Sequence, residues 1–137
     1  MMKLVVDANI LFSLFIKSSR IEELVFDDSL EMYAPEFIFE EFQIYEEYII
    51  SKTQRTSLEF QTLLHILKKR INIIPLKNFS EYIQEAKNIS PDINDIQYFA
   101  LALKLQCPLW SNDKELKTKQ HYILVYSSQD LINIFLC

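Results

Sequence analysis

Short apolar runs alternate with longer stretches of helical periodicity along the chain. The runs are rich in β-branched residues or are bounded by proline, which is typical of strands. Strands are predicted over residues 4–6, 31–34, 71–76, 108–110 and 122–126. In the longer stretches, apolar residues recur three and four positions apart, as in an amphipathic helix. Helices are predicted over residues 10–16, 18–26, 36–50, 57–70, 80–88 and 93–105, and a last helix is capped by Ser127 or Ser128.

This alternation predicts β-α units and therefore a parallel sheet. The predicted strands are continuous apolar runs without polar alternation, which is typical of a sheet that is covered on both faces. The sequence contains no internal repeat and no linker rich in proline or serine. We therefore expect one domain over residues 1–137, with a three-layer α/β/α fold around about five parallel strands.

The composition excludes several classes of active site. Glycine is absent from all 137 residues, although it makes up about 7 % of average sequences. A P-loop, a dinucleotide-binding turn and a nucleophile elbow all require glycine, so none is expected. His65 and His121 are far apart, and Cys107 and Cys137 lack C-x-x-C spacing, which argues against a zinc site. Any chemistry here must therefore come from carboxylates.

The absence of glycine also affects the helix ends. Many helices end on a residue in the left-handed backbone conformation, usually glycine and sometimes asparagine. Asparagines stand at the predicted helix exits, so we expect the left-handed positions to be Asn72, Asn78 and Asn88.

Charge and cysteine content bear on location and partners. The formal net charge is −5, which argues against a basic nucleic-acid coat but not against an enzyme that brings cations to its substrate. Two cysteines beside a full core are expected to be free thiols in a reducing cytosol. The apolar N-terminal run contains Asp7 and Asn9 and lacks a small-residue cleavage site, so no signal peptide is expected. No stretch approaches the ~18 apolar residues of a membrane span, and we expect a cytoplasmic protein.

Acidic residues gather where the predicted strands end. Asp7 directly follows the first strand, Asp113 follows strand 108–110, and Asp92 and Asp95 open the helix that leads into that strand. The carboxyl ends of parallel strands meet at one edge of the sheet, so these acids are expected to lie together. Each acid alone also has a plainer interpretation, because aspartate is a good N-cap: Asp7 precedes a helix, and Asp92 and Asp95 have N-cap and N3 spacing.

The predicted helix over 36–50 offers a further acid, Glu41. Its polar stripe, which we expect to face solvent, consists of Glu36, Glu40, Gln43 and Glu47. The neighbouring stripe, which we expect to face the core, consists of Phe37, Glu41, Ile44 and Tyr48. A carboxylate on a core face is costly unless its charge is compensated, and no Lys or Arg lies within a helical turn of Glu41. Either Glu41 reaches the rim of the core, or a cation shared with the other acids compensates it.

Acids on separate segments with no basic partner in reach predict a site for a hard cation. Oxygen ligands of this kind suit Mg²⁺ or Mn²⁺. Asp95 shares a stripe of its helix with Phe99 and Ala102, so it is expected to face inward at the sheet edge. Asn112 and Glu115 have capping-box spacing, which is the plainer interpretation of the segment around Asp113.

The order and spacing of these residues resemble the PIN-domain ribonucleases, a family that includes VapC-type toxins of toxin–antitoxin pairs. The resemblance runs from Met2 to about Leu116. Four segments carry it: Val5-Val6-Asp7-Ala8-Asn9, Ala34-Pro35 leading to Glu40-Glu41-Phe42, Asp95 with Ala100-Leu101-Ala102, and Trp110-Ser111-Asn112-Asp113. In the second segment, the family pattern selects the glutamate that an apolar residue follows, Glu41.

The resemblance implies a metal-dependent endoribonuclease. Its four carboxylates, which would hold one or two Mg²⁺ or Mn²⁺ ions, are Asp7, Glu41, Asp95 and Asp113. Asp92 could replace or supplement Asp95, and Asn9 and Ser111 would orient the carboxylates and water. Water activated by the metal would cleave RNA and leave 5′-phosphate and 3′-hydroxyl ends. The family also implies an antitoxin protein and a homodimer as partners.

Two other functions are considered beside this one. A phosphoacceptor signalling module also gathers acids at this sheet edge, but it needs an aspartate at the end of a central strand, and strand 71–76 ends in Pro75-Leu76-Lys77. A PIN-like fold without catalysis, acting as a binding or scaffold protein, is the other alternative. This silent protein would differ from a nuclease in side-chain placement that is finer than a sequence pattern specifies.

Overall fold

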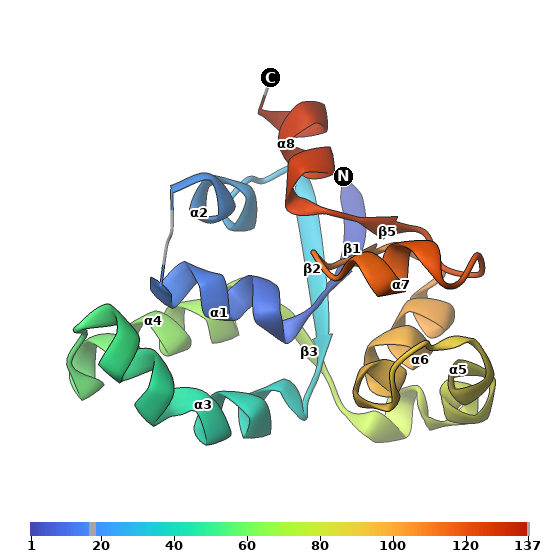
Figure 1. Cartoon of the computed structure of the whole chain (residues 1–137), viewed down its shortest axis with the longest axis horizontal. Helices are drawn as coiled ribbons and strands as arrows, with labels where there is room; N and C mark the ends of the chain where they lie inside the picture. The colour runs from blue at the N-terminus through green and yellow to red at the C-terminus, as the bar shows by residue number, and fades with distance from the viewer. Residues whose placement is uncertain (17–18, 137) are drawn as a thin grey trace.

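The computed structural model describes residues 1–16 and 19–136. Five parallel strands form one sheet in the order β3-β2-β1-β4-β5, with helices on both faces (Figure 1). The strands are β1 (Met2–Val6), β2 (Leu30–Pro35), β3 (Asn72–Ile74), β4 (Leu109–Trp110) and β5 (Val125–Tyr126). The predicted α/β class with a parallel five-stranded sheet is confirmed.

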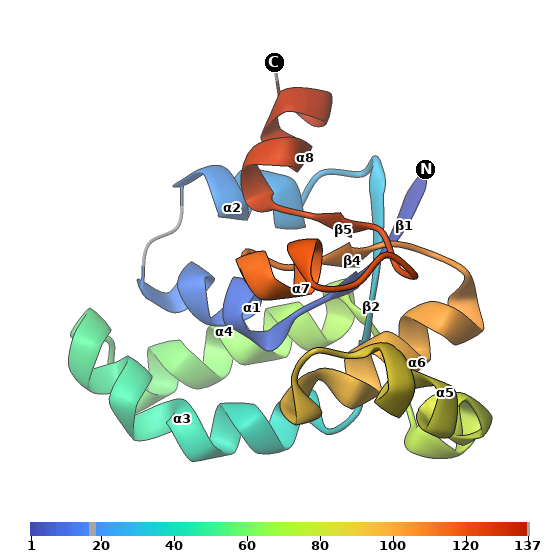
Figure 2. The same ribbon diagram turned by 45° about the vertical axis from the view of Figure 1, so that its right-hand side comes forward.

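Figures 1 and 2 show α1 to α4 on one side of the sheet and α5 and α6 on the other. The α-helices are α1 (Ala8–Ile16), α2 (Ser19–Val25), α3 (Ile38–Thr53), α4 (Ser57–Arg70), α5 (Ile83–Ile89), α6 (Ile96–Leu105), α7 (Lys114–Thr118) and α8 (Ser128–Phe135). Short 3-10 helices are η1 (Leu76–Asn78), η2 (Ser80–Tyr82) and η3 (Ile93–Asp95). Helix α6 packs on β1 and β2, and α8 packs against α2.

The winding of the sheet determines where a site can form. From the central strand β1 the chain runs outward through β2 to β3, then returns to the other side of β1 to form β4 and β5. The order therefore reverses between β1 and β4, and in open α/β sheets a crevice opens at such a point, outside the carboxyl ends of the strands. Val6 of β1 is level with Trp110 of β4, so these two strands end together.

Two differences from the predicted strands occur at prolines. Pro35 was expected to stop the second strand, but it is the last residue of β2 and pairs with Ile74. The next residue continues the ladder, because the Glu36 N–H donates to the Ile74 carbonyl at 3.0 Å. The third strand is shorter than predicted, since Pro75 lacks the N–H needed to continue it and η1 follows.

The buried face of α3 differs from the predicted one. The side chains that enter the core are Ile38, Phe42 and Ile49. Ile44 is 74 % exposed and Tyr48 is 55 % exposed, so the stripe predicted to face the core is mostly in solvent. The core stripe lies one residue further along the helix, a rotation of about 100°. Glu41 consequently stands at the edge of the buried face, partly covered.

Glutamine, not asparagine, occupies the left-handed helix ends. Among the described residues, positive φ occurs at Gln54 (58°) and Gln106 (53°). Their N–H groups donate to carbonyls of the last turns of α3 and α6. The asparagines expected there lie inside β3, η1 and α5. A chain without glycine accepts the steric cost of a side chain at these positions, about 1–2 kcal/mol for each residue.

Two further observations concern thiols and membranes. Cys107 is a buried free thiol, and Cys137 lies outside the described residues. Within the part of the chain that the structure describes, none of the helices has the length and apolar character that crossing a bilayer requires.

Candidate functional site

An acidic pocket opens at the carboxyl edge of the sheet. Its volume is about 390 Å³, and the acids that line it are Asp7, Glu41, Asp92, Asp95 and Asp113. The remaining lining residues are Asn9, Phe37, Ile44, Tyr45, Asn94 and Tyr98. None of these described residues is Lys, Arg or His. The pocket therefore brings together all five acids that the sequence singles out, and no side chain that lines it supplies a positive charge.

Asp7 lies at the centre of the sheet edge and is only 5 % exposed. Its backbone N–H continues the ladder by donating to the Trp110 carbonyl at 3.0 Å. Its carboxylate accepts a hydrogen bond from Ser111 Oγ at 2.8 Å and one from the Asn9 N–H at 3.1 Å. Burial raises the pKa of Asp7, although these two donors favour the charged form.

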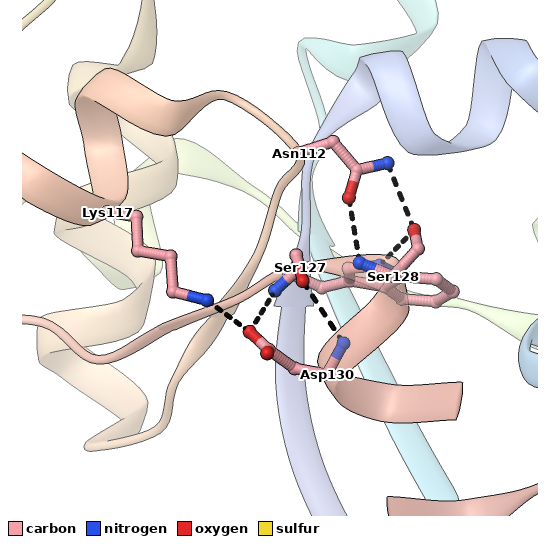
Figure 3. A network of polar contacts seen from close by, with 6 residues as sticks. Asn112, Lys117, Ser127, Ser128 and Asp130 are labelled. Carbon is pink, nitrogen blue, oxygen red and sulfur yellow. Dashed lines mark hydrogen bonds and ion pairs between the residues drawn. The ribbon is translucent and has the colours of Figure 1, made fainter. Parts of the chain in front are cut away.

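Ser111 connects the ends of β1 and β4. While its hydroxyl donates to Asp7, the same oxygen accepts the Asp113 N–H at 3.1 Å. One buried serine therefore ties the carboxylate of Asp7 to the backbone of Asp113. The Asp113 carboxylate itself caps α7, because Oδ1 accepts the Glu115 N–H at 2.9 Å. The cap predicted for Asn112 is thus made by Asp113, while Asn112 bonds to Ser128 of α8 (Figure 3).

Glu41 reaches the pocket from α3 and contacts a residue that the sequence did not single out. Tyr98 of α6, which is buried, donates its hydroxyl to Glu41 Oε1 at 2.9 Å. Burial raises the pKa of Glu41, and the charge of Asp7 raises it further. The pKa of Tyr98 is also raised, by burial and by Glu41, so the phenol stays protonated and remains a donor. Its position three residues after Asp95 on one helical face is the signal that could have found it.

Among the acids of the pocket, Asp95 has the pKa that is shifted most from its usual value. It ends η3, immediately before α6. Burial and the negative charges of Asp7, Asp92, Asp113 and Glu41 together raise its pKa to about 7. Asp92 precedes it as the N-cap of η3, where Oδ1 accepts the Asn94 N–H at 2.9 Å. Asp95 therefore experiences the negative charge of the whole pocket.

Two of the three lysines that follow Asp113 form ion pairs with other acids. Lys117 of α7 forms an ion pair with Asp130 of α8. Lys119 pairs with Glu115 at 3.1 Å. Lys114 is exposed directly after Asp113.

The oxygen atoms that line the pocket are of the kind that the predicted cation binds. Its ligands are carboxylate oxygens, which suit Mg²⁺ or Mn²⁺. A bound cation would relieve the charge repulsion that, together with burial, raises the pKa of Asp95. In the described part of the chain, however, no group of three or more His, Cys, Asp or Glu side chains is arranged to hold a metal ion. The chemistry and charge of the pocket therefore fit a divalent cation, while its carboxylates surround the space and do not converge on one point.

Fold and site together define a parallel α/β protein with an acidic crevice at the point where its strand order reverses. The model of the PIN domain matches residues 5–121, and the chain belongs to the PIN domain family. Its fold is similar to a chain in the crystal structure of VapBC2 from Rickettsia felis bound to a DNA fragment from their promoter. The TM-score is 0.66 at 18 % identity, and the alignment covers 92 % of this chain and 98 % of that chain.

A second similar fold occurs in a toxin–antitoxin complex from Klebsiella pneumoniae. Its TM-score is 0.61 at 15 % identity, with 91 % of this chain and 97 % of that chain covered. No curated protein sequence matches the chain significantly. At these identities the two structures establish the fold alone.

Proposed function

We propose that this protein is a divalent-metal-dependent endoribonuclease, with one catalytic domain over residues 1–137. The observation that carries the proposal is the pocket lined by five acids and, among its described lining residues, by no cation. In a PIN domain, such a pocket at the carboxyl edge of the sheet is suited to bringing metal ions to a polyanionic substrate. The family assignment and the charge of the pocket are independent supports.

The proposed ligands are Asp7, Glu41, Asp95 and Asp113, which would hold one or two Mg²⁺ or Mn²⁺ ions. Asp92 lines the same pocket and could supplement Asp95. The bound metal would lower the pKa of a water molecule and stabilise charge on the entering and leaving oxygens of the phosphodiester. The pKa values of Asp7, Glu41 and Asp95 are all raised, so protons compete with a cation for these carboxylates. The site would therefore bind a cation more readily as the pH rises.

Neighbouring residues would hold the ligands in place. Ser111 donates to Asp7 and accepts from the Asp113 backbone, so it fixes one carboxylate relative to the other. Tyr98 would orient the Glu41 carboxylate by donating its hydroxyl to Oε1. Asn9 lines the pocket and donates its N–H to Asp7. Partners of this kind commonly change metal affinity or activity by about 10–100-fold when they are removed.

The similar structures come from toxin–antitoxin complexes, so we also propose an antitoxin protein as a partner of this chain. A cytoplasmic location, where RNA is available, and a homodimer complete the proposal. The proposed substrate is RNA.

One observation favours a second candidate function. No three acidic, imidazole or thiol side chains in the described residues are arranged around one ion. A PIN-domain protein whose acids never converge would be catalytically silent and would act as a binding or scaffold protein.

The test is cleavage of end-labelled single-stranded RNA by the purified protein with Mn²⁺, with EDTA, and with the Asp95→Asn variant. Asp28→Asn is the matched control, because Asp28 is exposed and does not line the pocket. Cleavage that requires both Mn²⁺ and Asp95, and that survives in Asp28→Asn, supports the nuclease. Folded protein that binds Mn²⁺ without cleaving a broad set of RNAs contradicts the endoribonuclease. Folded protein that binds no Mn²⁺ overturns the metal site and supports the silent alternative.

A further inference from the structure

The segment that carries Asp113 is held from two sides. Between β4 and α7, Ser111 bonds to Asp7 of the acidic pocket. The residues before and after it, Trp110 and Asn112, instead bond to Ser128 in the first turn of α8. Figure 3 shows Asn112 and Ser128 facing one another across this contact. Within this segment, Ser111 therefore contacts the pocket, and the residues on either side of it contact helix α8.

The contact between Asn112 and Ser128 uses both ends of the amide. Asn112 Oδ1 accepts the Ser128 N–H at 2.7 Å, and Asn112 Nδ2 donates to Ser128 Oγ at 3.0 Å. The same hydroxyl accepts from Trp110 Nε1 at 3.0 Å. Ser128 is 8 % exposed and Trp110 is buried, whereas Asn112 is exposed, so the amide closes the outer edge of a buried contact. The amide is fixed because both of its polar atoms have partners.

A second tie joins the far side of the segment to the same helix. Lys117 of α7 pairs with Asp130 of α8, as Figure 3 also shows. Asp130 is held in turn by the capping box of α8, in which its carboxylate accepts the Ser127 N–H at 2.9 Å and its N–H donates to Ser127 Oγ at 3.1 Å. Helix α7 therefore cannot move away from α8 without breaking an ion pair.

Among the described residues, Asp113 itself is held only by near neighbours in the sequence. Its N–H bonds to Ser111 and its carboxylate to the Glu115 N–H, both two residues away, and its side chain is exposed. The position of its carboxylate relative to Asp7 thus depends on the anchored backbone around it. Helix α8, to which this backbone is anchored, lies outside the family match, which ends at residue 121.

We propose that Asn112 is a positioning residue, which sets where Asp113 stands in the acidic pocket by binding the first turn of α8. The proposal rests on the function proposed above, because it assigns α8 a role in building the metal centre. It predicts that Asn112 acts on the metal only through Asp113.

A double-mutant cycle tests this dependence, with Mn²⁺ affinity measured by calorimetry. Asn112→Ala should weaken Mn²⁺ binding by about tenfold or more, in the range seen when a support of a ligand is removed. In the Asp113→Asn background, the same substitution should cause no further loss. Asn133→Ala is the matched control. Asn133 lies on the exposed side of α8 and bonds to Gln129 at 2.9 Å, away from the segment, so its loss should leave Mn²⁺ affinity unchanged.

Equal losses in both backgrounds would mean that Asn112 only supports the fold, and an unchanged affinity in Asn112→Ala would mean that it does not position Asp113. Either result overturns the proposal. Should Asn112→Ala not fold, Ser128→Ala takes its place. It keeps the backbone N–H that Asn112 Oδ1 accepts and should show a smaller loss with the same dependence on Asp113.

Amide hydrogen exchange in the metal-free protein separates this proposal from the nuclease itself. Asn112→Ala should speed exchange of the amides of residues 112–114, and Asn133→Ala should not. If the wild-type protein neither binds Mn²⁺ nor cleaves RNA, the proposed function fails. Faster exchange in that case still supports anchoring of the segment by α8, and unchanged exchange overturns it.

Discussion

The acidic pocket has two halves that hold their carboxylates differently. In the strand half, at the ends of β1 and β4, the carboxylate of Asp7 accepts two hydrogen bonds and Ser111 joins it to Asp113. In the helical half, Glu41 accepts one hydrogen bond from Tyr98. Asp95 accepts none from the residues that the structure describes. Hydrogen-bond donors therefore compensate the Asp7 carboxylate in the strand half, whereas the helical half has fewer donors for its negative charge.

The pKa values follow the same division. Ser111 and Asn9 partly offset the effect of burial on Asp7. For Asp95 every cause acts in one direction, and its pKa rises to about 7. A carboxyl group without donors can be neutralised by a proton or by a cation. We infer that the strand half gives the pocket its geometry, while the helical half makes it responsive to metal and to pH.

The largest expected effect separates two adjacent glutamates of α3. Glu41→Gln should lower Mn²⁺-dependent RNA cleavage by more than the about 10–100-fold that follows loss of a supporting residue, because it removes a proposed ligand. Glu40→Gln should leave cleavage unchanged, since Glu40 is exposed and does not line the pocket. Rates measured on end-labelled RNA under single-turnover conditions check both. Equal effects would remove Glu41 from the site.

Metal binding should stabilise the protein through the helical half. At a Mn²⁺ concentration one hundred times its Kd, the free energy of unfolding should rise by about 2.7 kcal/mol. Asp95→Asn should lose most of this increase, because it removes the carboxylate that feels the most repulsion. Thermal melts with Mn²⁺, with EDTA and at matched ionic strength measure it. A full increase in Asp95→Asn would place the metal in the strand half alone.

Removing one hydrogen bond from each half should have unequal effects on stability. Ser111→Ala should cost about 1–3 kcal/mol, because it removes the hydrogen-bond partner of Oδ2 of the buried Asp7 and that of the Asp113 N–H. Tyr98→Phe should cost about 0.5–1.5 kcal/mol, because the half-buried Glu41 can bond to water instead. Urea unfolding of the metal-free proteins checks the order. A larger cost for Tyr98→Phe would show that the helical half is held more tightly.

The strand half was the easier half to predict. Asp7 follows an apolar strand directly and Asp113 follows one after Ser111 and Asn112, and the parallel topology then places strand ends at one edge. The position of Glu41 in the pocket was predicted from an incorrect helix face: the stripe that holds it is exposed at Ile44 and Tyr48. Helical periodicity locates a buried face only to within one residue, or about 100°, and Glu41 stands at the boundary.

Long-range contacts account for what the sequence pattern could not predict. Asn112 has capping-box spacing with Glu115, yet its amide bonds to Ser128, sixteen positions away, and Asp113 caps α7. Tyr98 contacts Glu41 from a different helix. Local patterns favour the local partner, because nothing in them records which distant element packs alongside. The left-handed Gln54 and Gln106 likewise depend on where tertiary packing ends their helices.

The smallest expected effect is a dependence of stability on pH that originates in Asp95. Its pKa in the folded protein is about 7, above the usual value of 3.8. Between these two values the folded state binds more protons than the unfolded state, so the free energy of unfolding falls as the pH rises. The metal-free protein should therefore be more stable near pH 4 than near pH 7 as far as this group contributes. Above pH 7 the contribution should level off.

Asp95→Asn should remove this contribution and leave the rest of the pH profile in place. We expect its Tm to exceed that of the wild type by about 2–4 °C at pH 8, a small shift because solvent screens a carboxyl group that is only partly buried. At pH 4 the two Tm values should agree, since Asp95 is then protonated and neutral like asparagine. Asp28→Asn, on the exposed surface, should follow the wild type at both pH values. A Tm difference at pH 4 equal to that at pH 8 would assign the gain to packing and not to the charge of the helical half.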